Sequence, residues 1–422
     1  MNLYQIAVVL IVLAALFGYV NQRFLRLPFT IGLMVVSILF SAILMGVGLW
    51  APQLHEMEEF FVRQIDFEGL LMEGMLSFLL FAGALHIDFR QLAAQRWPIL
   101  IFATLGVLTS TFLIGGITYG LLNVLGLGQP FIYCLLFGAL ISPTDPIAVL
   151  GILKKAGVPK QLEAKIAGES LFNDGIGVVI FLTIYQIASG GDGHGGSGFG
   201  EVALLFLEEV GGGVLLGGLL GAGAYYLMRT IDSYEVEVLI TLALVMGGYW
   251  LASYLHFSGP LAMVVAGLMI GHDRFRTSSM SETTEKYVDD FWELLDVLLN
   301  AVLFVLIGLE IVILQLNGTY VLAGLLAIPV VLFCRFTALG IPIYLLGKRL
   351  DFLPGTNVIL TWGGLRGGIS IALALSLESQ MARDLILTMT YVVVVFSIVV
   401  QGLTVGKVVE RKLGADHQVA HS

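Results

Sequence analysis

The stretch ISPTDPIAVL, residues 141–150, interrupts an otherwise apolar segment with two prolines that flank a threonine and an aspartate. Pro143 and Pro146 each lack an N–H group and clash with the preceding turn, so a continuous helix is not expected here. A second stretch, TWGGLRGGIS at residues 361–370, places four glycines around Leu365 and Arg366, and its backbone also departs easily from a helix. The sequence therefore predicts two interrupted helices.

The composition places both interruptions inside a membrane. Of the 422 residues, 58% are hydrophobic and 12% are charged, whereas a soluble domain carries about 25% charged residues. A membrane-spanning helix needs about 20 largely apolar residues. The sequence predicts an all-α polytopic membrane protein with about thirteen spans, at 3–22, 28–48, 69–87, 97–121, 130–153, 162–188, 203–228, 235–255, 259–272, 290–314, 318–347, 355–377 and 384–408.

Basic residues indicate the orientation, because lysine and arginine favour cytoplasmic loops. With the N-terminus outside, seventeen of the 21 basic residues fall on the inner side, and Arg63 and Arg383 fall outside. The first apolar run has no basic stretch ahead of it, so we expect a retained span and not a cleaved signal. The chain is expected to end in a short cytoplasmic tail, 411–422, which favours a prokaryotic inner membrane over a eukaryotic one with a regulatory domain.

The two interruptions indicate a transporter. Broken backbone at membrane depth is tolerated only where it is buried or lines a cavity, and paired interruptions in two halves of a chain point to a binding site. The fifth and twelfth spans are seven apart, so they cross the membrane in opposite directions, as inverted repeats would. Asp145 is suited to balance the positive ends of the half-helices and Arg366 the negative ends. Direct contact of Asp145 with a transported ion is the alternative.

A third motif, GESLFNDG at residues 168–175, places acids just ahead of an apolar run. Residues four apart share a helix face, so Glu169 aligns with Asn173, and Ser170 aligns with Asp174. These oxygen ligands suit a hard cation. No cluster of histidine or cysteine accompanies them, which makes zinc or copper a poor fit.

The two acids of this motif have different expected roles. Glu169 can pair with Arg335, the lone charge of the eleventh span, and a buried ion pair of this kind fixes helices without net charge. Asp174 has no obvious basic partner. A carboxylate removed from water favours its neutral, protonated form, and a cation can displace that proton. One site with two competing occupants is the physical basis of exchange.

Five motifs, in order along nearly the whole chain, resemble those of the monovalent cation:proton antiporters of the first subfamily. That subfamily comprises the prokaryotic NhaP-type sodium/proton antiporters and their eukaryotic exchanger relatives. The motifs are SPTDP (142–146), GESLFNDG (168–175), the arginine of CRF (Arg335), FVLIGLEI (304–311) and GGLRGGI (363–369).

The resemblance implies a homodimeric, thirteen-helix antiporter fold with inverted repeats and two crossing, discontinuous helices. Helices 1–3, at 1–95, and helices 8–10, at 233–316, would form the dimerisation side. Helices 4–6, at 96–190, and helices 11–13, at 317–410, would form the transport bundle. An outer loop and the connector helix 7 would occupy 191–232.

The resemblance also implies an ion site. Asp174 would carry the cation or proton, Ser170 and Thr144 would add ligands for Na⁺, and Asn173 would support them. With asparagine at 173 in place of a second acid, one-for-one electroneutral exchange is expected. The chain departs from the pattern in the third span, where many members have an acidic motif and this chain has Ala82 within FAGALHID.

Several readings remain open from the sequence. Sodium, with lithium, is the expected cation, and potassium is the alternative within the same family. Asp145 and Asp174 on adjacent spans could instead form the dyad of an intramembrane aspartyl protease. A cation channel would need a ring of carbonyls or acids. We expect no enzyme activity, cofactor or nucleic acid, and as partners only membrane lipid and a second copy of the chain.

Overall fold

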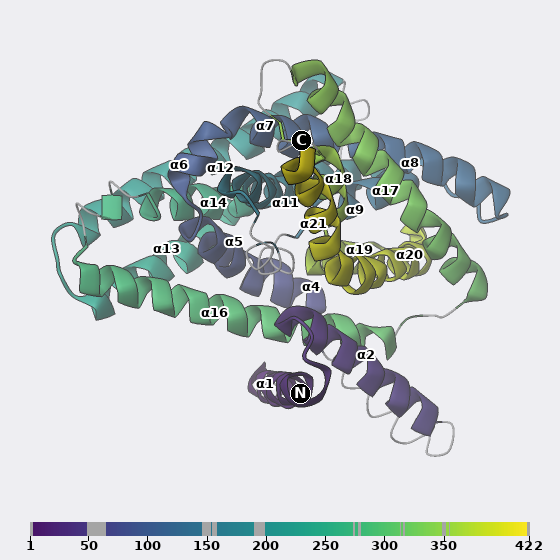
Figure 1. The fold of residues 1–422 in the computed structure, drawn as a ribbon, viewed down its shortest axis with the longest axis horizontal. Coiled ribbons are helices and arrows are strands. Elements are labelled where there is room, and N and C mark those ends of the chain that lie inside the picture. Colours follow the sequence, from purple (N-terminus) through teal and green to yellow (C-terminus); the bar gives the residue numbers. More distant parts are fainter. Residues whose placement is uncertain are drawn as a thin grey trace.

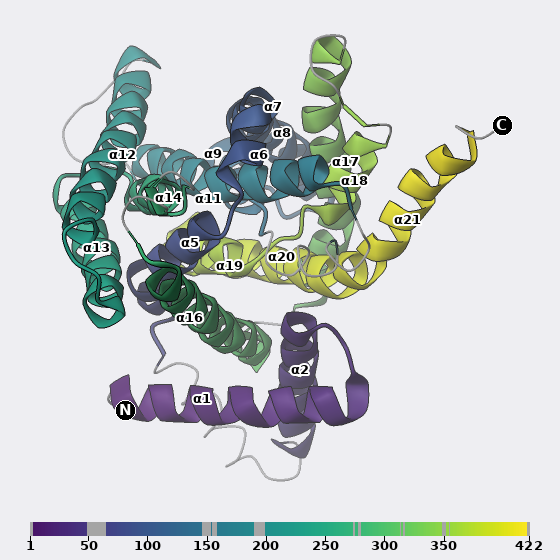
Figure 2. The ribbon, with the colours of Figure 1, turned by 60° about the vertical axis from the view of Figure 1, so that its left-hand side comes forward.

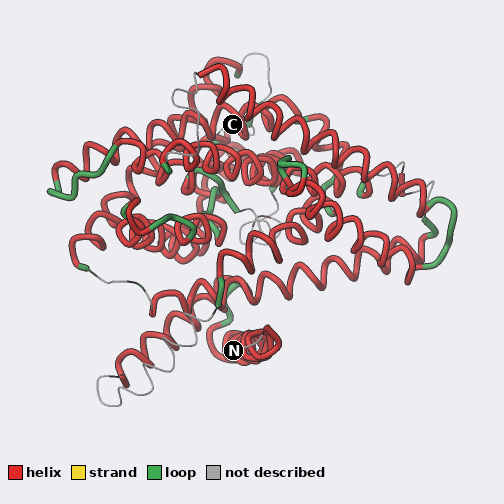
Figure 3. The backbone as a smooth tube through the Cα atoms, turned by 180° about the vertical axis from the view of Figure 1, so that it is seen from behind, coloured by secondary structure: helices red, strands yellow, loops and turns green. Residues whose placement is uncertain are grey.

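The computed structural model describes residues 3–48, 65–145, 153, 158–189, 199–272, 275–276, 280–312, 314, 317–347, 352–353 and 355–419. Helices make up nearly all of this part of the chain, and connecting segments are short (Figure 3). Residues 49–64, Pro146 and the glycine-rich start of the predicted outer loop, at 191–198, lie outside the described residues.

The helices follow the predicted apolar segments in order. Their bounds are α1 Leu3–Val20, α2 Phe29–Gly48, α4 Phe67–Gly69, α5 Leu76–Leu85, α6 Phe89–Ala94, α7 Arg96–Ile101, α8 Val107–Val124, α9 Phe131–Ile141, α11 Lys160–Ala188, α12 Phe199–Met228, α13 Tyr234–Tyr254, α14 Gly259–Ile270, α16 Glu282–Leu309, α17 Gly318–Leu346, α18 Thr356–Gly363, α19 Gly368–Leu375, α20 Arg383–Phe396 and α21 Gly402–Val419. Short π-helical segments continue α1 or join neighbouring helices into longer rods. They lie at Asn21–Leu25, Leu70–Met75, Phe102–Gly106 and Ser397–Gln401.

The membrane-spanning character of the chain is confirmed, with changes at the ends of segments. Ten helical rods in the described residues are long and apolar enough to cross a membrane, and two shorter apolar helices are α9 and α14. The start predicted at residue 290 is wrong, because α16 begins at Glu282. The helix α21 continues to Val419, into the segment 411–422 that is predicted to be the tail. Hydropathy marks only the apolar part of a helix, and these charged ends extend beyond it.

Both predicted interruptions are present, and they meet. The helix α9 ends at Ile141, and α18 and α19 are separated by residues 364–367. The backbone N–H of Asp145 donates a hydrogen bond to the Leu365 carbonyl at 2.8 Å, in an antiparallel bridge. A backbone group freed by one break is thus satisfied by a backbone group of the other, as backbone at membrane depth requires.

The helices pack around this crossing. In Figure 2, α12 and α13 form one edge of the molecule, α17 and α21 form the opposite edge, and α1 lies across the bottom below α16. The centre is occupied by α9 and α11, with α8 and α17 packed against each other beside α9. The long helix α16 packs on α2 and α5, and it crosses the face of the molecule seen in Figure 1. The broken segments are therefore held inside the helical bundle.

Helices α8 and α9 approach closely at Gly138, which supplies the first test of the fold. A Cβ at this position would lie 2.3 Å from the Thr111 carbonyl oxygen, a backbone atom that cannot turn away. We expect Gly138→Ala to lower the free energy of unfolding by about 1–3 kcal/mol, the usual cost of overpacking. Thermal unfolding of the purified protein in detergent would measure this loss.

The matched control for this change lies on α8. A Cβ at Gly116 would meet no atom within 4 Å in the described structure, so Gly116→Ala should leave the unfolding midpoint unchanged or slightly raised, since alanine favours helix over glycine. Equal midpoints for the two variants would show that α8 and α9 are not packed as described.

Candidate functional site

A cavity of about 720 Å³ opens beside the crossing of the two broken segments. The described residues form three walls: α5 with the 86–91 segment that follows it, α16, and the group formed by α11 with the 143–145 and 367–370 segments. Six carboxylates and two basic groups of the described residues line it, namely Asp88, Asp145, Glu163, Asp174, Glu293 and Asp296 with His86 and Lys160. An excess of one sign of charge in a low-dielectric cleft raises the local concentration of the opposite ion, so this cavity attracts cations.

Asp174 lies on α11, and its side chain lines the cavity while 7% of the residue is exposed. Among the described residues, its carboxylate makes no hydrogen bond and no ion pair. A buried carboxylate without a partner is costly, because a charge removed from water is normally compensated by pairing or by protonation. Asp174 is therefore suited to take up a proton or a cation that arrives through the cavity.

Glu169, five residues earlier on α11, is fully compensated. Arg335 of α17 forms a two-pronged ion pair with it, with Nη2 2.9 Å from Oε2 and Nη1 3.2 Å from Oε1. The Arg335 Nε also donates to the Leu360 carbonyl of α18 at 3.1 Å. Both side chains are buried, so this pair fastens α11, α17 and α18 together without adding net charge.

Asn173, Thr144 and Ser170 form a compact network behind Asp174. The Asn173 amide donates to Glu169 Oε1 at 2.7 Å and to Thr144 Oγ1 at 2.9 Å, and it accepts the Thr144 backbone N–H at 3.1 Å. The Thr144 and Ser170 hydroxyls are 2.9 Å apart. These three residues are at most 2% exposed and do not line the cavity. Of the four predicted ion-site residues, only Asp174 faces it.

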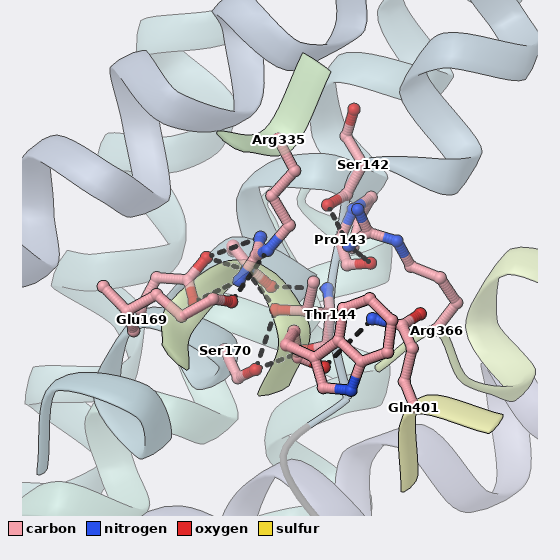
Figure 4. Close-up of polar contacts among 11 residues, drawn as sticks. Ser142, Pro143, Thr144, Glu169, Ser170, Arg335, Arg366 and Gln401 are labelled. Atoms are coloured by element: carbon pink, nitrogen blue, oxygen red, sulfur yellow. Dashed lines mark hydrogen bonds and ion pairs between the residues drawn. The ribbon is translucent and has the colours of Figure 1, made fainter. Parts of the chain in front are cut away.

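Arg366 and Asp145 occupy the ends of the broken helices. The Arg366 guanidinium donates to the carbonyls of Ser142 and Pro143, at 2.9 and 3.0 Å, just past the end of α9 (Figure 4). The Asp145 carboxylate lies against Gly367 at the start of α19, so close that a Cβ there would be 2.5 Å from its Oδ2. A positive group thus meets a carbonyl end and a negative group meets an N–H end, as helix dipoles favour.

Two sets of polar residues around the crossing were not predicted. Gln401 donates to the Trp362 carbonyl at the end of α18, and Ser397 accepts the Arg366 backbone N–H. Glu293 and Asp296 of α16 line the cavity opposite Asp174. Gln401 stands out in the sequence as an amide inside an apolar span, and the two acids recur three residues apart on one helix face.

Comparison with known proteins identifies the family. The family described as sodium/hydrogen exchanger, transmembrane, matches residues 11–411. The chain belongs to this exchanger family. One relative, the Na⁺/H⁺ antiporter NhaP of Pseudomonas aeruginosa, is 52% identical over 407 residues, which cover 95% of each chain. Another, the Na⁺/H⁺ antiporter NhaH of Halobacillus dabanensis, is 36% identical over 398 residues, 93% of each chain.

The exchanger fold is also recognised in a solved structure. The sodium proton antiporter MjNhaP1 of Methanocaldococcus jannaschii matches with a TM-score of 0.73 and 21% sequence identity, over 98% of this chain and all of that one. At this identity the match shows the fold alone. Together with the apolar helices, membership of the exchanger family makes the chain an integral membrane protein.

Proposed function

We propose that this protein exchanges Na⁺ for H⁺ across the membrane and that Asp174 holds either the cation or the proton. The single observation that carries the proposal is the Asp174 carboxylate, which faces a cation-attracting cavity and has no hydrogen-bond or ion-pair partner among the described residues. The relatives named as Na⁺/H⁺ antiporters support the choice of ions. Li⁺, which is smaller and equally hard, is expected to substitute for Na⁺.

The neighbouring hydroxyls supply further oxygen ligands. Ser170 and Thr144 lie behind Asp174 and are hydrogen-bonded to each other. We infer that a dehydrated cation at Asp174 replaces that mutual hydrogen bond and draws both hydroxyl oxygens towards itself. A hard cation favours such oxygen ligands. When a proton replaces the cation, the two hydroxyls close on each other again.

The network supports an exchange of one cation for one proton. The Asn173 amide does not titrate, and it is fixed by its bonds to Glu169 and Thr144. Glu169 is neutralised by Arg335. Asp145 is placed against the start of α19. Among the described residues, Asp174 is then the one carboxyl at the crossing left to carry a proton, so we expect electroneutral exchange. Protons should outcompete the cation at low pH.

The same contacts support a division into moving and stationary parts. Ion-pair and hydrogen bonds join α11 to α17, α17 to α18, and α11 to the 142–145 segment that follows α9. Leu303 of α16 meets this group by apolar contact at Gly368, where both residues line the cavity. We infer that helices of 96–190 and 317–410 move together against a scaffold from 1–95 and 233–316, where a second copy would pair. We also propose a prokaryotic inner membrane as the location, with the N-terminus outside, an orientation that the distribution of basic residues supports.

The decisive experiment uses purified protein in sealed vesicles with an imposed pH gradient. Sodium, lithium, potassium and choline chloride would be added in turn while a pH-sensitive dye reports proton movement. Collapse of the gradient by sodium and lithium, without a steady current across the membrane, is the expected result. An equal response to potassium would reassign the cation. A steady current would refute electroneutral exchange, and no cation-dependent proton movement by folded protein would overturn the proposed function.

A further inference from the structure

The cavity wall opposite Asp174 carries its own polar groups, all on one face of α16. Glu293, Asp296 and Leu303 line the cavity. Asn300 lies between the last two, four residues after Asp296 and three before Leu303, and such spacings place side chains on one helix face. Asp296 and Asn300 are thus neighbours on the helix face that carries the cavity-lining residues, with Asn300 buried just beneath the lining.

Asn300 is joined to Asp296 and has an unused acceptor. Its Nδ2 donates to the Asp296 Oδ1 at 3.0 Å and to the Asp296 carbonyl at 2.8 Å. The residue is 1% exposed, and in the described structure its Oδ1 has no hydrogen-bond partner. Buried hydrogen-bond acceptors almost always have a partner. The unpaired Asn300 Oδ1, next to the Asp296 carboxylate, therefore indicates a site for a ligand that is bound by oxygen atoms.

The surrounding charges favour a cation as that occupant. Asp145, on the opposite wall, repels the Asp296 carboxylate, and a positive ion near Asp296 relieves this repulsion. The third wall contributes Ala82 and Gly83, which offer no polar side-chain atom, and His86, a basic group that acts on Asp296 from the end of α5. No group of three or more acids, histidines or cysteines suited to a metal ion occurs in the described ranges. A site with so few protein ligands is suited to a monovalent cation that keeps part of its water, and not to Ca²⁺.

We propose that Asp296 and Asn300 form a second monovalent-cation site on α16, which holds a partly hydrated Na⁺ before it passes to Asp174. This inference rests on the proposed exchange function and adds a step to it. The ion enters the acid-lined cavity and pauses at the Asp296 carboxylate and the Asn300 Oδ1. It loses its remaining water when it crosses to Asp174 on the opposite wall.

The first test separates binding from turnover. Asp296→Asn keeps the shape of the side chain and removes its charge, so the KM for Na⁺ should rise about tenfold while the maximal rate of proton movement changes less than about twofold, as expected when only the local ion concentration falls. Asp296→Glu, which keeps the charge, should restore the KM to within about threefold. The control is Asp290→Asn, the same change at an exposed position of α16 outside the cavity, which should leave the KM unchanged.

The second test measures binding without transport. Sodium chloride should raise the thermal-unfolding midpoint of the Asp174→Asn variant relative to choline chloride, because an ion that binds the folded state stabilises it. The rise should disappear in the Asp174→Asn/Asp296→Asn double variant. A wild-type KM in Asp296→Asn, or the same sodium effect in both variants, would overturn the second site and leave the exchange function intact. If the wild-type protein shows no cation-dependent proton movement in the vesicle assay, the exchange function itself is overturned.

Discussion

Replacing Asp174 with asparagine is expected to abolish cation-dependent proton movement, with at least about a hundredfold loss of rate. The amide has nearly the same shape as the carboxyl, but it neither releases a proton nor offers the charge that offsets the dehydration of a cation. Because Asp174 has no partner among the described residues, the change breaks no hydrogen bond there. The vesicle assay with sodium would measure the loss, and an unchanged unfolding midpoint would show that the protein is folded.

A matched control lies in the first turn of α20. Asp384→Asn removes a carboxylate of the same kind from a position outside the cavity, and exchange should stay within about twofold of the wild type, as is usual for substitutions away from a site. Full activity of Asp174→Asn would remove this residue from the mechanism. Loss of activity in both variants would point to a general effect of charge and not to a site.

Breaking the buried ion pair is expected to cause the largest loss of stability. Glu169→Gln leaves the Arg335 guanidinium buried without its counter-charge, with side-chain exposures of 6% for Arg335 and 2% for Glu169 in the native pair. Removal of one partner from such a pair usually costs about 3–5 kcal/mol. The expected result is a strongly lowered unfolding midpoint. Exchange should fall as well, because Asn173 also depends on Glu169.

A partly exposed pair provides the comparison. Arg276 and Asp289 are joined at 2.7 Å, but their side chains are 12% and 30% exposed, so Asp289→Asn should cost about 1 kcal/mol, near the upper value for surface pairs. The double variant Glu169→Gln/Arg335→Met should recover part of the loss seen in Glu169→Gln, since no charge is then left unpaired. Equal losses for Glu169→Gln and Asp289→Asn would show that the first pair is not buried as described.

The sequence was most informative where a residue type has one physical consequence. Prolines at 143 and 146 and the glycines around Arg366 forbid or weaken a helix, and the structure has breaks at both places. A charge in an apolar span requires compensation, and Glu169 and Arg335, 166 residues apart, lie together. These features depend on local chemistry that no packing arrangement can remove.

The sequence was least informative where two partners come together through packing. Asn173 and Ser170 share α11 with Asp174, but their bonds to Thr144 depend on how closely the 142–145 segment approaches that helix. Nothing in the spacing tells whether a hydroxyl faces a cavity or a neighbour. The polar face of α16 is visible as a repeat at Glu293, Asp296 and Asn300, yet its direction is set by packing on α2 and α5.

The balance of fixed charges at the crossing determines how membrane voltage acts on the proposed moving part. Glu169 is matched by Arg335, and Asp145 and Arg366 add one charge of each sign. With a proton or Na⁺ at Asp174 the assembly is neutral, so a membrane potential does no work on it. With Asp174 empty it carries one negative charge, and moving that charge through 100 mV involves about 2.3 kcal/mol. The membrane potential therefore acts on the proposed moving part only when Asp174 is empty, and does not act on it when Asp174 holds a proton or Na⁺.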